Sequence, residues 1–375
     1  MQFIDLITQK NRIRQSLLKR IEAIVDHGHY IMGPEVLELE KQLAAWVGTK
    51  HCVSCSSGTD ALLMPLLAKG IGPGDAVLTT PFTFVATAEV ISLAGATPVF
   101  VDVLPGTFNI DPDLVGPAVE SAKRKGLNPK AIIPVDLFGL PADYDRLEKV
   151  AADHGLWLLE DAAQGFGGTL HGRRAGSFGL VGATSFFPAK PLGGYGDGGA
   201  IFTNDDDLDK VLRSVRVHGQ GDGDDKYQNV RIGINGRLDS IQAAVLLEKL
   251  AIFDDELVER QRVADAYSSR LKGRVRIPEV QEGYTSCWAQ YSVLAASTAE
   301  REKLMGALQQ AGIPSMIYYR IPLHLQKAYA GLSYAKGEFP VSEDFSERIL
   351  SLPMHPYLKD EEIGKICDVI LSTPG

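Results

Sequence analysis

Short apolar runs alternate with amphipathic stretches over the first two thirds of the chain. Apolar runs of strand length lie at 77–80, 97–102, 131–136, 156–160, 183–187 and 198–203. Between the first four, apolar positions recur every three or four residues, which predicts helices at 83–95, 111–124 and 142–154. Strands that are apolar throughout are typical of a parallel sheet covered on both faces. The pattern therefore predicts β/α units built around one mainly parallel sheet.

Helical periodicity at the start of the chain predicts helices at 11–27 and 34–47.

The pattern changes in the last third of the chain, where a long helix predicted at 238–257 would continue toward residue 270. Beyond it, we expect strands at 287–293 and 315–319 and helices at 298–311 and 360–371. We predict a large α/β domain over residues 1–245 and a smaller α+β domain over residues 246–375, with an exposed polar loop at 219–225.

Composition and charge narrow the class of protein. The 375 residues carry 38 basic and 47 acidic side chains, a net charge of −9, with no basic stripe interleaved with aromatics, so we do not expect a nucleic acid partner. No apolar stretch approaches the ~18–20 residues of a membrane span, and the first residues lack the layout of a signal peptide. Cys52 and Cys55 have the spacing of a zinc or redox pair, but no second pair accompanies them, so we expect both in the core. The composition favours a reduced, cytoplasmic enzyme.

One pair of residues carries the strongest chemical signal. Asp161 ends the apolar run Leu-Trp-Leu-Leu-Glu160-Asp161, so it would lie at the carboxyl end of a buried strand, where open α/β sheets bind ligands. Lys190 ends the segment Ser185-Phe-Phe-Pro-Ala-Lys190, ahead of a glycine-rich loop at 193–199. Either residue alone is more often structural or solvated. Together they are an amine that can bond covalently to pyridoxal 5'-phosphate (PLP) and a carboxylate for its pyridine nitrogen.

A second segment has the form of an anion site. Ser56-Ser57-Gly58-Thr59-Asp60 is a turn of small residues between a strand and a helix that begins near Thr59. The first backbone N–H groups of that helix are free to face a phosphate, although the same sequence is an ordinary N-cap in most proteins.

With these motifs, the chain resembles the PLP-dependent sugar aminotransferases of the DegT/DnrJ/StrS family from Gly28 to Pro356. The resemblance implies the aspartate aminotransferase fold (PLP-dependent transferase fold type I) and a homodimer with a composite active site. It implies that Lys190 is the catalytic amine and that Asp161 faces the pyridine nitrogen. The remaining cofactor contacts that it implies are Gly58, Thr59 and Ser185 at the phosphate, Phe84 stacked on the ring, Gln164 at the phenolic oxygen and Asn235 at the neighbouring subunit's phosphate.

The resemblance also implies the substrates. The family's amino donor is usually L-glutamate, and its acceptor is the keto group of a nucleotide-linked sugar. The segment Lys190-Pro-Leu-Gly-Gly-Tyr-Gly-Asp197-Gly-Gly is closer to members that act on 3-oxo sugars. We therefore expect UDP-2-acetamido-2-deoxy-3-oxo-D-glucuronate as acceptor, on a route to bacterial surface polysaccharide such as lipopolysaccharide O-antigen. Candidate sugar contacts are Tyr30, Arg237, Tyr318, Tyr319, Arg320 and His324.

Alternatives remain at three points. The acceptor could lack the C6 carboxylate, as in a 3-oxo UDP-N-acetylglucosamine or a 3-oxo-6-deoxy dTDP sugar. A non-catalytic regulator with a PLP fold would have no need for Lys190, Asp161 and Gln164 together. Asp136 stands where relatives often carry His or Ser, and neither it nor His218 receives a role.

Overall fold

The chain is described here from a computed structural model. It covers residues 1–221, 223 and 227–375. The predicted exposed loop at 219–225 therefore lies partly outside the described residues, at positions 222, 224 and 225.

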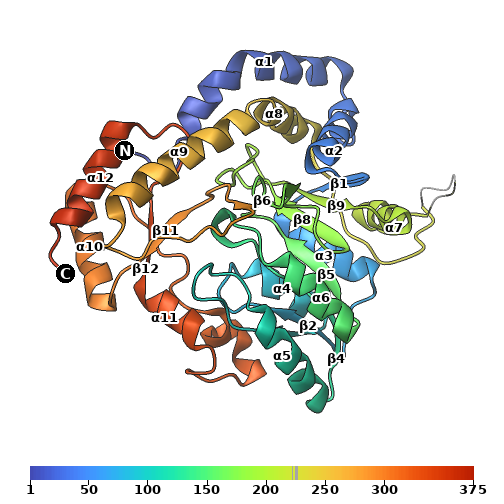
Figure 1. Ribbon diagram of the computed structural model, residues 1–375. Helices are drawn as coiled ribbons and strands as arrows, with labels where there is room; N and C mark the ends of the chain where they lie inside the picture. Colours follow the sequence, from blue (N-terminus) through green and yellow to red (C-terminus); the bar gives the residue numbers. More distant parts are fainter. Residues whose placement is uncertain (222, 224–226) are drawn as a thin grey trace.

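A seven-stranded sheet forms the centre of the molecule (Figure 1). Its strands, in spatial order, are β1 (His51–Cys55), β9 (Gly199–Thr203), β8 (Val181–Ser185), β5 (Trp157–Asp161), β4 (Asn128–Ile132), β2 (Asp75–Thr79) and β3 (Thr97–Phe100). Strand β9 runs antiparallel to both of its neighbours, and all other neighbouring pairs are parallel. The predicted mainly parallel sheet is confirmed.

Helices cover both faces of this sheet. One face packs against α3 (Gly58–Ala68), α4 (Ala86–Leu93) and α7 (Asp206–Arg216). The other face packs against α2 (Pro34–Val47), α5 (Pro112–Arg124), α6 (Tyr144–His154) and α8 (Ser240–Leu250). Leu78 and Ile132 lie in the apolar cluster on one face, whereas their strand neighbours Val77 and Ala131 lie in the cluster on the other, as strand geometry requires. The result is a three-layer α/β/α arrangement, the architecture of the PLP-dependent transferase fold type I.

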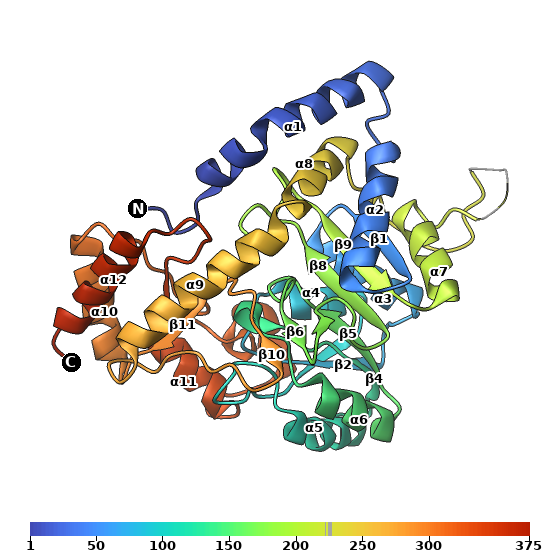
Figure 2. The same ribbon diagram turned by 45° about the horizontal axis from the view of Figure 1, so that its top comes forward.

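The carboxyl-terminal third forms its own apolar cluster to one side of the sheet (Figure 1). That cluster is formed by α9 (Phe253–Leu271), β11 (Tyr291–Leu294), α10 (Thr298–Gln310), β12 (Ile349–Leu352) and α12 (Asp360–Ser372). Helix α11 (Pro340–Arg348), which leads into β12, packs its Phe345 into a different apolar cluster. The amino-terminal helix α1 (Leu6–His27) lies along α8 (Figure 2). A domain boundary after residue 245 would fall within α8, and that division stays a prediction. Small elements complete the fold: β6 (Thr169–Leu170), β7 (Arg173–Arg174), β10 (Tyr284–Thr285), and short 3-10 turns at Leu137–Gly139, Leu323–Leu325 and Lys327–Leu332.

Two predicted elements were wrong, and a third was misplaced. The single helix expected at 238–257 is two helices, because α8 ends at Leu250 and α9 starts at Phe253 with three acidic side chains in its first turn. Carboxylates at that position interact favourably with the positive end of a helix dipole and stabilise a new start. The strand expected at 315–319 is an irregular segment with one bridge, Met316 to Ser351, and the rings of Tyr318 and Tyr319 pack into an aromatic cluster instead. The strand expected at 287–293 begins only at Tyr291.

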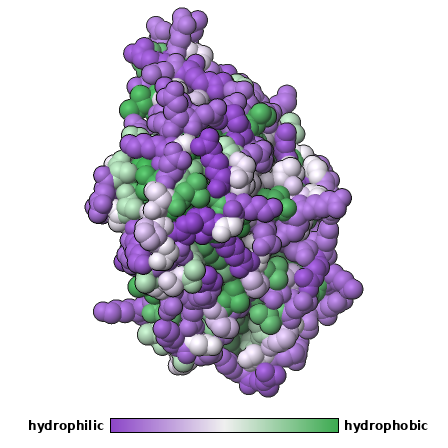
Figure 3. All heavy atoms as spheres, turned by 60° about the vertical axis from the view of Figure 1, so that its left-hand side comes forward, coloured by the Kyte–Doolittle hydropathy of each residue, from purple (hydrophilic) through white to green (hydrophobic). Residues whose placement is uncertain are grey.

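The four cysteines are free and buried, so the prediction that Cys52 and Cys55 belong to the core is confirmed. Among the described residues, no helix is both long and apolar enough to cross a membrane. Figure 3 shows the face that lies at the left of Figure 1, where polar side chains predominate and apolar ones are scattered.

Candidate functional site

The predicted cofactor residues converge on one edge of the sheet. Strands β5 and β8 end at Asp161 and Ser185, and β1, which points the same way, leads into Ser57 and α3. A Cβ added to Gly58 would lie 2.5 Å from the Cβ of Ser185, so only glycine allows the start of α3 to approach the end of β8 this closely. The carboxyl edge of a parallel sheet is where α/β proteins bind ligands.

The start of α3 presents free backbone donors. Ser57 is the N-cap: its Oγ accepts from the Asp60 N–H at 3.0 Å and its carbonyl accepts from the Ala61 N–H at 3.0 Å. The N–H groups of Gly58 and Thr59 have no acceptor among the residues that the structure describes. Two such donors at the positive end of a helix dipole, with the Ser185 hydroxyl beside them, suit a phosphate group.

Two hydrogen bonds orient the carboxylate of Asp161. Its Oδ2 accepts from the Thr87 hydroxyl at 2.8 Å, and its Oδ1 accepts from the Ala163 N–H at 3.2 Å. Burial raises the pKa of Asp161, while these two hydrogen bonds and the positive charge of Lys190 oppose that rise. Sequence reasoning missed Thr87, because a threonine in the first helical turn after a strand carries no signal of the side chain that it will meet.

Lys190 lies close enough to Asp161 for their charges to interact. Burial lowers the pKa of the Lys190 amine, against the opposing effects of Asp161 and the Cys287 thiol. Its backbone N–H donates to the Phe187 carbonyl at 2.8 Å. The glycine-rich loop that follows is fixed by Gln242 of α8, whose Oε1 accepts from the Tyr195 N–H at 2.8 Å. A depressed amine pKa favours the neutral, nucleophilic form.

Gln164 is fixed between two segments. Its Oε1 accepts from the Phe138 N–H at 3.0 Å, and its Nε2 donates to the Tyr319 hydroxyl at 2.9 Å. The Tyr319 ring lies 6.5 Å from the ring of Phe84, which is 53% exposed. An open aromatic face beside Asp161 and Gln164 fits the stacking role expected of Phe84.

The predicted sugar contacts are less closely gathered. Tyr318 and Tyr319 are half-buried, Arg320 is exposed, and Tyr30 is 50% exposed on the chain leading into α2. His324 is buried, with its Nε2 3.1 Å from Glu343 Oε1 and its Nδ1 without a partner among the described residues. His218 is exposed at the end of α7. The roles of these residues stay predictions.

Asn235 and Arg237 lie on the chain just before α8, with Asn235 exposed and Arg237 half-buried. Asn235 Oδ1 accepts from Arg237 Nη2 at 2.6 Å. The segment sits beside the phosphate-type turn, because the Ser56 N–H donates to the Gly236 carbonyl at 3.1 Å.

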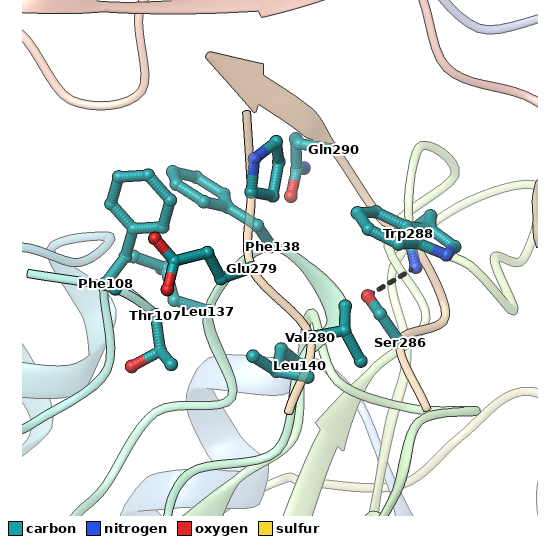
Figure 4. A pocket seen from close by; sticks show the side chains of 12 residues that line it. Thr107, Phe108, Leu137, Phe138, Leu140, Glu279, Val280, Ser286, Trp288 and Gln290 are labelled. Atoms are coloured by element: carbon teal, nitrogen blue, oxygen red, sulfur yellow. Dashed lines mark hydrogen bonds between the residues drawn. The ribbon is translucent and has the colours of Figure 1, made fainter. Parts of the chain in front are cut away.

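A small apolar pocket near Phe138 is separate from these groups (Figure 4). Segments 106–108, 137–140, 278–280 and 286–290 line it, and none of the predicted site residues is among them. The Trp288 N–H donates to Ser286 Oγ at 3.1 Å across one wall. We interpret this pocket as a small packing gap beside Phe138, whose N–H donates to Gln164, and not as part of the cofactor site.

Comparison with known proteins places these residues in context. The model of the DegT/DnrJ/EryC1/StrS aminotransferase family matches residues 11–371. The chain is 46% identical over 367 residues to a UDP-2-acetamido-2-deoxy-3-oxo-D-glucuronate aminotransferase of Pseudomonas aeruginosa, covering 98% of both chains. It is 40% identical over 374 residues to a UDP-N-acetyl-3-dehydro-alpha-D-glucosamine 3-aminotransferase of Acidithiobacillus ferrooxidans, covering 99% of this chain and 97% of that one.

A solved structure is similar over the whole chain. The crystal structure of a DegT DnrJ EryC1 StrS aminotransferase from Brucella abortus superposes with a TM-score of 0.95 and 54% identity, covering 99% of this chain and 98% of that one. Solved relatives of this fold include forms that contain PLP or its amine form.

Proposed function

The chain belongs to the DegT/DnrJ/EryC1/StrS aminotransferase family, and from that premise we propose its substrates, its site residues and its assembly. It is a PLP-dependent nucleotide-sugar aminotransferase. We propose that it moves the amino group of L-glutamate to the C3 keto group of UDP-2-acetamido-2-deoxy-3-oxo-D-glucuronate. The observation that carries this acceptor is the 46% identity, over nearly the full length, to an enzyme named for it.

The described residues fit the cofactor. The free N–H groups of Gly58 and Thr59 and the Ser185 hydroxyl would hold its phosphate, and Asp161 would accept a hydrogen bond from its protonated pyridine nitrogen. Phe84 would cover one face of the ring, and Gln164 would contact the phenolic oxygen. When bound, PLP carries the amino group between a donor and an acceptor half-reaction and withdraws electrons from the carbon that loses a proton.

Lys190 would have two roles. Its amine would hold the cofactor covalently, and the same amine, when free, would take the proton from the substrate carbon. Burial lowers the pKa of the Lys190 amine, which keeps a larger share of it neutral and able to accept a proton. Thr87 would keep Asp161 oriented, and its hydrogen bond opposes the rise that burial causes in the pKa of Asp161.

The acceptor differs from its rivals by one carboxylate at C6. A carboxylate needs a cation or several hydrogen-bond donors, which Arg237, Arg320, Tyr318 and Tyr319 could supply. His324 and Tyr30 complete the proposed sugar site. A direct test loads the enzyme with amino groups from L-glutamate, removes the donor, and adds UDP-linked 3-oxo sugars with and without the C6 carboxylate.

We expect recovery of the original cofactor absorbance to be at least about tenfold faster per unit concentration with the uronate, since one charge-assisted contact is worth about 1.5–3 kcal/mol. Equal rates would contradict the uronate proposal. Faster reaction of the neutral sugar would favour the second candidate, 3-oxo UDP-N-acetylglucosamine, for which the 40% identity to the Acidithiobacillus enzyme is the supporting observation.

We also propose a homodimer with two composite sites. Asn235 is exposed and Arg237 is half-buried in their own subunit, and we propose that Asn235 reaches the neighbour's phosphate and Arg237 its sugar. Exposed apolar side chains nearby, Tyr30, Ile31 and Ile232, are suited to burial against a second copy.

Subunit complementation tests the composite site. Lys190→Ala and Arg237→Ala should each be nearly inactive as homodimers. Random pairing of the two variants gives half heterodimers, each with one intact site, so about a quarter of wild-type activity should return. The matched control pairs Lys190→Ala with Asp161→Asn, which should restore nothing because each substitution spoils a different site of the heterodimer. No recovery in the first mixture would show that each subunit holds a complete site.

The proposed setting follows from the acceptor. An enzyme that aminates a UDP-linked uronate would work in the bacterial cytoplasm, where nucleotide sugars are made, and would supply precursors of surface polysaccharide such as O-antigen. The acceptor assay above tests the acceptor on which this proposed setting depends.

A further inference from the structure

A pair of buried carboxyl groups lies next to Asp161. Asp136 follows β4 and Glu160 is the penultimate residue of β5, and both side chains are fully buried. The Asp136 N–H donates to the Asp161 carbonyl at 3.0 Å. Leu158 packs against α6, and because successive side chains of a strand point to opposite faces, Glu160 lies on the same face as Leu158. Asp161 lies on the opposite face, where it meets Thr87.

The hydrogen bonds of this pair leave one oxygen unexplained. Asp136 Oδ1 accepts from the Ala142 N–H at 2.9 Å and the Tyr144 hydroxyl at 2.8 Å. Glu160 accepts from the Gly176 N–H at 2.6 Å and the Phe178 N–H at 2.9 Å, one on each oxygen. Asp136 Oδ2 is buried, and no N–H or O–H group among the described residues donates to it. The Asp136 carboxyl group is nevertheless within hydrogen-bonding contact of the Glu160 carboxyl group. Two ionised carboxylates contain no hydrogen to donate, so such a contact requires a proton on one of them.

The surroundings oppose a second negative charge. Burial raises the pKa of both Asp136 and Glu160. The charge of Asp136 and its hydrogen-bonding contact raise the pKa of Glu160 further, whereas the same contact opposes the rise in the pKa of Asp136. Besides Glu160, the described ionisable groups with a recorded electrostatic interaction with Asp136 are Asp161, Tyr144, Tyr284 and Cys287, and none of these four is a cation. Two adjacent carboxyl groups in such a place cannot both ionise.

The pair is also in contact with the turn that carries the cofactor residues. A Cβ added to Gly165 would lie 2.2 Å from the Cβ of Asp136, so the 161–165 turn rests directly on this side chain. That turn holds Asp161 at one end and Gln164 at the other.

We propose that Asp136 and Glu160 share one proton and act as positioning residues, fixing the turn that aims Asp161 and Gln164 at the cofactor. This inference rests on the proposed function for its catalytic consequence, whereas the shared proton does not depend on it. Each amide variant keeps the contact without that proton, because Asn or Gln supplies an N–H to the remaining carboxylate.

Infrared spectroscopy of the holoenzyme tests the proton directly. At about pH 7.5 an ordinary Asp or Glu is ionised, so the wild type should show the C=O stretching band of a protonated, buried carboxylic acid. Asp136→Asn and Glu160→Gln should each remove that band. The matched control is Asp102→Asn, because Asp102 is a buried carboxylate whose hydrogen bonds come from N–H and O–H donors: the N–H groups of Val103, Val341 and Ser342 and the Ser342 hydroxyl. It should leave the band in place. A wild type without the band, or a band that survives both amide variants, would refute the shared proton.

Kinetics and circular dichroism test the positioning role. Asp136→Ala should lower kcat about 10- to 100-fold, the effect of misplacing catalytic groups by about 1 Å, with little change in KM for glutamate. The induced circular dichroism of the bound cofactor should change, and Asp136→Asn should restore both signals. If Asp136→Ala keeps wild-type kcat and dichroism, the positioning role is wrong. If the wild type shows the band but no transamination, the shared proton stands and the proposed function fails.

Discussion

Lys190→Ala should lose transamination almost completely, with kcat lower by about 10⁴-fold or more. The substitution removes both the covalent amine and the base that moves the proton, and a positioned general base alone contributes about 10²- to 10⁴-fold. The check is the glutamate half-reaction, followed by the absorbance of the bound cofactor. Cofactor should still bind through the phosphate contacts at Gly58, Thr59 and Ser185, but its absorbance should not respond to glutamate on the wild-type time scale.

Two comparisons separate this result from misfolding. Lys123→Ala removes an exposed lysine on α5 whose ion pair, within the described part of the chain, is with Glu120, and it should keep wild-type activity. A small primary amine added to Lys190→Ala should restore part of the proton transfer, because it supplies the missing base in solution. Substantial activity in Lys190→Ala without added amine would remove Lys190 from the mechanism.

The layered fold was predictable because its signals are local. Continuous apolar runs gave β2, β4 and β5 to within a few residues, and Asp161 stands at the end of β5 as the apolar run before it indicated. The start of α3 was equally readable, since Ser57 is an N-cap and Gly58 has no side chain to block the approach of Ser185. Lys190 and Asp161 were found from their strand-end context and from a family resemblance that supplied their pairing.

What the sequence did not predict depends on contacts between distant segments. Thr87 and Asp161 are joined by a hydrogen bond across 74 positions, and Gln164 and Tyr319 across 155. The break between α8 and α9 was missed because a helical pattern continues through it, and only the cluster of acids at 254–256 marks a second start. The contact between Asp136 and Glu160 is likewise invisible in sequence, where each reads as a polar residue at a strand end.

Asp161→Asn should lower kcat by about 10²- to 10³-fold while leaving KM for glutamate within a few-fold, the range of removing one preorganised electrostatic contact. The amide is nearly isosteric and can still accept from the Thr87 hydroxyl, so the fold should persist, but it has no negative charge to keep the pyridine nitrogen protonated. A pH titration of the bound cofactor's absorbance should show this loss as a shifted transition. Thr87→Val provides a graded comparison: it keeps the carboxylate and removes one hydrogen bond to it, worth about 1.5–3 kcal/mol for a charged group, so kcat should fall only about 10- to 100-fold. If Asp161→Asn were as active as the wild type, the carboxylate would not face the cofactor nitrogen, and the arrangement of Lys190, Asp161 and Gln164 would need a different ligand.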